Sequence, residues 1–193
     1  MSEGRVSDLP GPAVVLVGPP GAGKSTVGAL LAGRLGVDFT DVDELIVARA
    51  GRSVSDIFTN DGEPVFRAME ETEVAVALGR ENGVLALGGG AVLSHRTRDA
   101  LRGHHVVFLA VGMPEGVRRT GLSTARPLLA GMNPRATFKA LLDARLPLYR
   151  DVAVAEIATD GRSPDEVVAD VLRTVPHGQS GMSGSSVTQE NGR

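Results

Sequence analysis

The stretch AVVLVGPPGAGKST, residues 13–26, decides the fold that this sequence predicts. Its first five residues are apolar and rich in valine, which is typical of a strand buried inside a parallel sheet. The run that follows matches the phosphate-loop pattern Gly-x-x-x-x-Gly-Lys-Ser at every fixed position. Glycines let successive backbone N–H groups turn toward phosphate oxygens, and the start of the next helix adds positive charge. The segment therefore predicts a nucleotide-binding loop between a strand and a helix.

Two side chains of this loop suit a nucleotide and its metal ion. Lys24 can reach the β- and γ-phosphates, and the Ser25 hydroxyl can ligate Mg²⁺. The chain contains 18 arginines and only two lysines, Lys24 and Lys139. The lysine inside the glycine-rich loop stands out against this bias.

Beyond the loop, short apolar runs alternate with helical patterns along the chain. Such alternation predicts an α/β fold in three layers, in which helices cover both faces of a five-stranded parallel sheet. Strands are expected at 13–17, 37–41, 84–87, 106–110 and 153–158. Helices are expected from the loop to the C-capping Gly36, at 43–50, after a capping box at 53–56, and at 62–80, 94–101, 114–120, 134–146 and 163–175.

Length and composition fit one globular domain and exclude several classes of protein. The 193 residues contain no cysteine, which excludes disulfides, thiolate metal sites and cysteine nucleophiles. A net charge of −3 and six aromatic residues argue against nucleic-acid and anionic-membrane partners. No apolar run has the length of a membrane span, and the start of the chain lacks a signal-peptide core, so a cytoplasmic protein is expected. We expect a flexible extension at 1–12, one domain at 13–175 and a disordered tail at 176–193.

Two acidic residues and a glycine run follow the second and third predicted strands. Asp41 and Asp43 can divide two tasks, one on the metal side through water and the other toward an acceptor hydroxyl. Alternatively, Asp43 simply N-caps the helix that follows it. Gly88, Gly89 and Gly90 form either a tight turn or a surface without side chains, against which a ring can lie.

Three arginines add a further signal. Arg67 lies in a long predicted helix, Arg126 in the aperiodic segment 121–133, and Arg145 near the end of a helix. Each of them alone is typical of a solvated surface. Together they suit a substrate carboxylate, which binds guanidinium forks, and a phosphoryl group, which needs positive charge brought by a lid.

Taken in order, six segments between residues 12 and 175 resemble the shikimate kinases. They are LVGPPGAGKSTVG, FTDVDELI, GRSVSDIFTNDGEPVFRAMEE, LALGGGAV, GVRRTGLSTARPLLAG and DARLPLYRDVA. The resemblance implies a P-loop kinase fold with an acceptor-binding region at about 42–70 and a mobile lid at about 121–133. It also implies ATP-dependent phosphorylation of the 3-hydroxyl of shikimate to shikimate 3-phosphate and ADP, a step of chorismate and aromatic amino-acid biosynthesis.

The same resemblance implies the residues of the nucleotide end. The ATP phosphates should bind Gly21, Ala22, Gly23, Lys24, Ser25 and Thr26. Mg²⁺ should be held by Ser25 and, through water, by Asp41. Arg126 should move from the lid onto the phosphates, and Arg119 and Arg162 should flank the adenine.

For the acceptor end, the resemblance implies a second set of residues. Shikimate should be held by Asp43, Arg67, Gly88, Gly89, Gly90 and Arg145. Arg67 and Arg145 should clamp its carboxylate, and Asp43 should accept the proton of the phosphorylated hydroxyl. Phe58 and Phe66 either wall this pocket or pack in the core.

Two other functions compete with this interpretation. One is another small-molecule P-loop kinase, such as a gluconate or nucleotide kinase. The other is a catalytically silent nucleotide-binding module that regulates a partner. Such a module is expected to lack Lys24, Asp43 or Arg126, and all three are present. The leading hypothesis is therefore a monomeric enzyme whose partners are ATP and shikimate, with Mg²⁺ as cofactor.

Overall fold

The structure, a computed structural model, describes residues 12–80, 83–120 and 133–176. The predicted tail from residue 177, the extension up to residue 11, and Arg126 with segment 121–132 lie outside these described residues. Pro12, at the end of the predicted extension, is buried.

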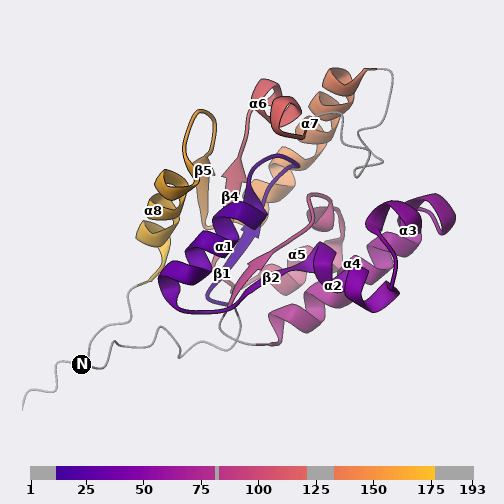
Figure 1. Cartoon of the computed structure of the whole chain (residues 1–193), viewed down its shortest axis with the longest axis horizontal. Helices are drawn as coiled ribbons and strands as arrows, with labels where there is room; N and C mark the ends of the chain where they lie inside the picture. Colours follow the sequence, from indigo (N-terminus) through magenta and orange to yellow (C-terminus); the bar gives the residue numbers. More distant parts are fainter. Residues whose placement is uncertain (1–11, 81–82, 121–132, 177–193) are drawn as a thin grey trace, which may run out of the picture.

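Five parallel strands form one sheet, as the alternating pattern predicts (Figure 1). Their order across the sheet is β2-β3-β1-β4-β5, so β1 lies in the middle. Because all strands run the same way, their carboxyl ends meet at one edge, where ligands of such sheets bind. The strands are β1 Val14–Val17, β2 Phe39–Asp41, β3 Val84–Ala86, β4 Val106–Ala110 and β5 Ala155–Ala158.

Helices cover both faces of this sheet (Figure 1). The described helices are α1 Lys24–Leu35, α2 Val42–Ala50, α3 Val54–Asn60, α4 Glu63–Leu78, α5 His95–Leu101, α6 Met113–Thr120, α7 Pro134–Val152 and α8 Pro164–Thr174. A 3₁₀ turn, η1 Ala91–Leu93, precedes α5. The capping box of Ser53 and Asp56 and the left-handed C-cap at Gly36 are both confirmed.

The alternation of side chains along β1 divides the core into two clusters. Val14 and Leu16 face the cluster that α1 and α8 complete, whereas Val15 and Val17 face the cluster of α2, α3, α4 and α5. Helix α7 reaches both clusters, because Phe138 packs in the first of them and the other end of the helix packs in the second. The fold is therefore the three-layer α/β arrangement predicted from the sequence.

Helix α7 is longer than predicted. We expected it to end at Leu146, before Pro147, but it continues through the proline to Val152. A proline lacks the N–H donor and its ring crowds the carbonyl one turn earlier, so a helix continues past it only where other contacts hold the next turn. Here the fully buried Tyr149 and the ion pair of Arg150 with Glu156 hold that turn.

Two glycines of α1 test how closely this helix packs on the sheet. A Cβ atom at the buried Gly28 would overlap the ring of Phe39 in β2, whereas a Cβ atom at the exposed Gly33 would meet nothing within 4 Å. We expect Gly28→Ala to lower the free energy of unfolding by about 1–2 kcal/mol, because overpacking outweighs the gain in helix propensity. Gly33→Ala should raise it by up to about 1 kcal/mol. Urea unfolding of both variants measures these changes, and equal effects would contradict the close packing.

Candidate active site

The phosphate loop turns tightly from β1 into α1. Gly21 and Gly23 have positive φ angles of 78° and 89°, a conformation that favours glycine. The Lys24 Nζ atom donates hydrogen bonds to the carbonyl oxygens of Gly18 at 2.7 Å and Pro19 at 3.1 Å. The ammonium group therefore lies over the loop, where a nucleotide phosphate would also lie.

Asp41 joins the phosphate loop to the start of α2. Its Oδ2 atom accepts a hydrogen bond from the Ser25 hydroxyl at 2.7 Å, and its Oδ1 atom accepts one from the Asp43 N–H at 3.0 Å. Asp41 is thus the N-cap of α2, so the alternative in which Asp43 caps this helix is wrong. Asp43 instead lies in the first turn of α2, with its Oδ1 atom 2.9 Å from the point where a Cβ of Gly88 would be.

Arg67 of α4 is held in one orientation by acids and aromatic rings. Its guanidinium donates to Glu63 at 3.0 and 3.1 Å and to Glu70 at 2.5 Å. The guanidinium carbon lies 6.0 Å from the ring centre of Phe58 and 5.2 Å from that of Phe66. Burial alone would lower the pKa of Arg67, but Glu70 and Glu63 raise it above its usual value. The two rings therefore wall this arginine while Phe66 also packs in the core.

The structure adds Glu70 to this end of the site, a residue that the sequence analysis missed. Its side chain is 2% exposed, and burial raises its pKa while Arg67 opposes the shift. Its charge also interacts with those of Asp43 and Arg145, so four ionisable side chains from α2, α4 and α7 converge here. Among the described residues, its Oε1 atom has no hydrogen-bond partner. The spacing of Arg67 and Glu70, three residues apart on a helix, was the signal available in the sequence.

The glycine run after β3 is required by space rather than by backbone conformation. None of its three residues has a positive φ angle. A Cβ atom at Gly88 would overlap Glu70, one at Gly90 would overlap Arg67, and one at Gly89 would lie 3.0 Å from Pro20. The glycines therefore leave room for Glu70, Pro20 and Arg67, and the use of this run as a surface for a ring stays a prediction.

Arg145 of α7 reaches the same surface from the other side. It is 4% exposed, and its Nη1 atom donates to the Gly89 carbonyl oxygen at 3.1 Å. The structure therefore brings together Asp43, Arg67 and Arg145, which lie far apart in the sequence.

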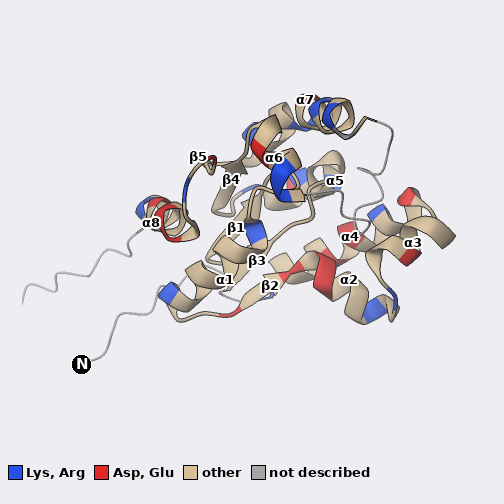
Figure 2. Cartoon of the chain, turned by 45° about the horizontal axis from the view of Figure 1, so that its top comes forward, with Lys and Arg blue, Asp and Glu red and all other residues tan. Residues whose placement is uncertain are grey.

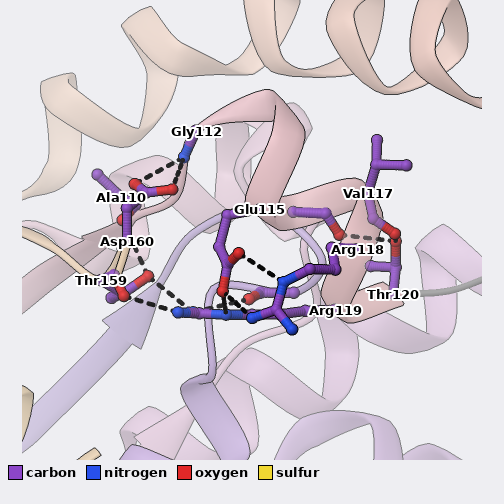
Figure 3. Close-up of polar contacts among 11 residues, drawn as sticks. Ala110, Gly112, Glu115, Val117, Arg118, Arg119, Thr120, Thr159 and Asp160 are labelled. Carbon is purple, nitrogen blue, oxygen red and sulfur yellow. Dashed lines mark hydrogen bonds and ion pairs between the residues drawn. The ribbon is translucent and has the colours of Figure 1, made fainter. Parts of the chain in front are cut away.

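Arg119 is held at the other end of the candidate site, as Figure 3 shows. Its guanidinium donates to the Glu115 carboxylate at 2.7 Å and to the carbonyl and hydroxyl oxygens of Thr159 at 2.7 and 3.1 Å. Hydrogen bonds from Arg118 and Arg119 lower the pKa of Glu115 to about 2. In the same figure, the Asp160 carboxylate accepts the N–H of Gly112, which ties the turn after β5 to the start of α6.

Arg162 faces the same hollow as Arg119. It donates to the carbonyl oxygens of Ala158 and Glu166, both at 3.1 Å, and pairs with Asp170 at 2.8 Å. The hollow has a volume of about 480 Å³. Its lining comprises Ala22, Gly23, Thr26 and Val27 beside the phosphate loop, and Glu115, Arg118, Arg119, Thr159, Gly161, Arg162, Pro164 and Val167.

The described helices differ in their balance of charge (Figure 2): α4 has four acidic residues and one arginine, whereas α1 has one lysine, one arginine and no acidic residue. None of the helices in the described part of the chain is long and apolar enough to cross a membrane.

Comparisons with known proteins agree with this geometry. A sequence model of the family described as shikimate kinase matches residues 20–176. A shikimate kinase of Saccharopolyspora erythraea is 66% identical over 164 residues, which are 85% of this chain and 94% of that protein. A shikimate kinase of Streptomyces avermitilis is 56% identical over 161 residues, 83% and 94% of the two chains. The solved structure of shikimate kinase from Acinetobacter baumannii in complex with shikimate has a TM-score of 0.82 and 36% identity, covering 84% of this chain and 91% of that one. Both its sequence and its fold show that this chain belongs to the shikimate kinase family.

Proposed function

We propose that this chain transfers the γ-phosphoryl group of ATP to the 3-hydroxyl of shikimate, which gives shikimate 3-phosphate and ADP. One observation carries the proposal: Arg67 and Arg145 converge on Glu70 beside Asp43, at the edge of the sheet that also carries the phosphate loop. A related protein with 36% identity has been solved in complex with shikimate. Arg67 and Arg145, together with Asp43, suit a small polyhydroxylated acid better than a nucleotide, and the acceptor panel below separates shikimate from gluconate.

The acceptor end suits a ring that carries a carboxylate and hydroxyls. The carboxylate accepts hydrogen bonds from Arg67 and Arg145, whose guanidinium groups are both largely buried. Glu63 and Glu70 hold Arg67 in place before the substrate arrives, which lowers the ordering cost of binding. The ring lies beside the backbone of Gly88, Gly89 and Gly90, close to the Arg67 and Glu70 side chains for which these glycines leave room.

At the proposed reaction centre, Lys24 supplies positive charge and Asp43 supplies a proton acceptor. The oxygen of the acceptor hydroxyl forms a bond to the γ-phosphorus while the bond to the β–γ bridging oxygen of ATP breaks. Asp43 takes the hydroxyl proton, and Lys24 stabilises the charge that develops on the phosphoryl oxygens. Arg126 lies outside the described residues, so its contribution to this charge stays a prediction.

Ser25 and Asp41 are suited to Mg²⁺. They offer a hydroxyl and a carboxylate oxygen 2.7 Å apart, the hard oxygen donors that this ion prefers. No cluster of three or more His, Cys, Asp or Glu that could hold a metal occurs in the described part, which fits an ion held mainly by phosphates and water. When bound, Mg²⁺ neutralises charge on the β- and γ-phosphates. Ser25 would ligate it directly and Asp41 through water.

The base of ATP lies in the hollow between Arg119 and Arg162 under this proposal. Both guanidinium groups line this hollow and are anchored by protein carbonyls and acids. The proposed enzyme works as a monomer in the cytoplasm.

An acceptor panel tests the proposed reaction. We expect ADP release to be faster with shikimate than with gluconate or nucleoside monophosphates at equal concentrations, measured in a coupled assay. Lys24→Ala should lower kcat by on the order of 10²-fold or more, because phosphoryl transfer depends on charge stabilisation. Lys139→Ala is the matched control, since Lys139 is exposed and pairs with Asp143. Faster turnover of gluconate or a nucleotide than of shikimate would overturn the acceptor assignment.

Substitution of Arg67 tests how the carboxylate is bound. Arg67→Ala should raise the KM for shikimate about tenfold or more, because the bound substrate carboxylate would lose one of the two guanidinium groups that pair with it in a buried site. The KM for ATP should stay within about twofold, since Arg67 lies at the acceptor end. Arg49→Ala is the control, because Arg49 also pairs with an acid of α4, Glu73, but is itself exposed. An unchanged KM for shikimate in Arg67→Ala would exclude this residue from the carboxylate site.

The ion pairs of Glu115 give a prediction for pH. The folded-state pKa of Glu115, about 2, lies below its usual 4.5, so its pairs stabilise the folded protein fully above pH 4.5. That stabilisation is lost as the pH falls from 4.5 toward 2. We expect wild type to be more stable than Glu115→Gln at pH 6 and this difference to shrink below pH 4.5. Urea midpoints at a series of pH values measure it; a difference that does not change with pH would contradict the shifted pKa.

A further inference from the structure

Tyr149 is a buried phenol that the proposed reaction leaves unused. Its side chain is fully buried, and its ring stacks on Phe108 of β4 with ring centres 5.0 Å apart and an interplanar angle of 19°. It follows Arg145 by one turn of α7, so both side chains lie on the same face of the helix. Its hydroxyl donates a hydrogen bond of 2.5 Å to the carbonyl oxygen of Gly89.

The Gly89 carbonyl therefore accepts two hydrogen bonds from α7, one from Tyr149 and one from Arg145 at 3.1 Å. The described backbone contains no cis peptide bond. In a trans peptide, the C=O and the N–H of the next residue point to opposite sides. Fixing this carbonyl toward α7 directs the Gly90 N–H away from α7. Gly90 is also the glycine whose missing side chain leaves room for the Arg67 guanidinium.

We propose that Tyr149 is a positioning residue of the acceptor site, whose hydroxyl fixes the Gly89–Gly90 peptide so that the Gly90 N–H is presented to the acceptor. The proposal rests on the proposed function. Tyr149 touches neither substrate; it acts through Gly89. Arg145 donates to the same carbonyl oxygen of Gly89, so fixing this peptide also fixes the place of Arg145 beside the substrate carboxylate.

The chemistry of the phenol supports this role over simple packing. The Tyr149 hydroxyl is protonated at neutral pH, as any phenol of ordinary pKa is, and burial raises its pKa further, to about 12. Ring stacking on Phe108 needs only the aromatic ring, which phenylalanine would supply equally well. The hydroxyl thus contributes a hydrogen bond to the glycine surface that the packing of the ring does not require.

Tyr149→Phe removes only this hydroxyl. We expect the KM for shikimate to rise about three- to tenfold, the effect of losing one buried hydrogen bond. The KM for ATP should stay within about twofold. In the ligand-free protein, the ¹⁵N order parameter of the Gly90 amide should fall relative to wild type, because one of the two bonds that hold its peptide is gone.

Thr97→Val is the matched control. Thr97 is 2% exposed, and among the described residues its hydroxyl oxygen has no hydrogen-bond partner. This variant also deletes one buried hydroxyl, but it should change neither KM nor the Gly90 amide. If Thr97→Val raised the KM for shikimate as much as Tyr149→Phe does, the loss of any buried hydroxyl would have the same effect. That result would overturn the proposal.

Two further results would overturn the positioning role. One is a Tyr149→Phe enzyme with lower stability but an unchanged shikimate KM and an unchanged Gly90 amide; the other is an equal rise in both KM values. The failure of the proposed function is a different outcome, namely a wild-type enzyme that does not phosphorylate shikimate. Even then, the order parameter of the Gly90 amide tests the role of Tyr149, because that measurement needs no ligand.

Discussion

The absence of side chains at residues 88–90 is the constraint on which the acceptor end depends. A side chain at each glycine would meet a different neighbour, which is Glu70 at Gly88, Pro20 of the phosphate loop at Gly89, and Arg67 at Gly90. Helix α4 and the phosphate loop can therefore both approach the end of β3 closely. Any larger residue would push at least one of them outward, because interiors at protein packing density have no spare volume. The glycine run thus sets the distance between the nucleotide loop and the acceptor residues.

Acidic and basic side chains lie close together at this edge of the sheet. Burial raises the pKa of Glu70, and Arg67 and Arg145 oppose this shift. Arg67 is paired with Glu63 as well, so its charge is held in place before any substrate binds. Arg145 contributes a second buried cation. Under the proposed function, a substrate carboxylate would accept charge-assisted hydrogen bonds from these two guanidinium groups, and such bonds are strong where the dielectric constant is low.

Local patterns in the sequence were sufficient for most of the fold. Apolar runs bounded by turns predicted β1, β3 and β4, which are buried on both faces, and the alternation with helices predicted the less buried edge strands β2 and β5. They failed for the end of α7, where the proline argued for a stop and the contacts of Tyr149, which no local pattern contains, carried the helix further.

The acceptor residues were less accessible to the same reasoning. Taken alone, Arg67 and Arg145 each look like solvated surface residues. The resemblance of the chain to the shikimate kinases was needed to place both of them at the acceptor carboxylate. The sequence allows Asp43 either to cap α2 or to face an acceptor hydroxyl. The structure assigns the N-cap to Asp41. Tyr149 could not be identified because its partners Gly89 and Phe108 lie elsewhere in the chain, whereas the spacing of Glu70 from Arg67 indicates an ion pair on α4 but not its burial.

The two ends of the site hold their arginines in different ways, and this difference has a functional consequence. Arg67 pairs with Glu70, whose side chain is only 2% exposed, and with Glu63 at 42%, whereas Arg119 pairs with Glu115 at 18% and Arg162 with Asp170 at 24%. Water and salt screen the partly exposed pairs more than the pair of Arg67 and Glu70. Solvent can therefore compensate for a change at Arg119 or Arg162, whereas a change at Arg67 leaves the buried Glu70 without its partner. Under the proposed function, recognition of the acceptor depends on this buried ion pair, whereas recognition of the base depends on pairs that water reaches.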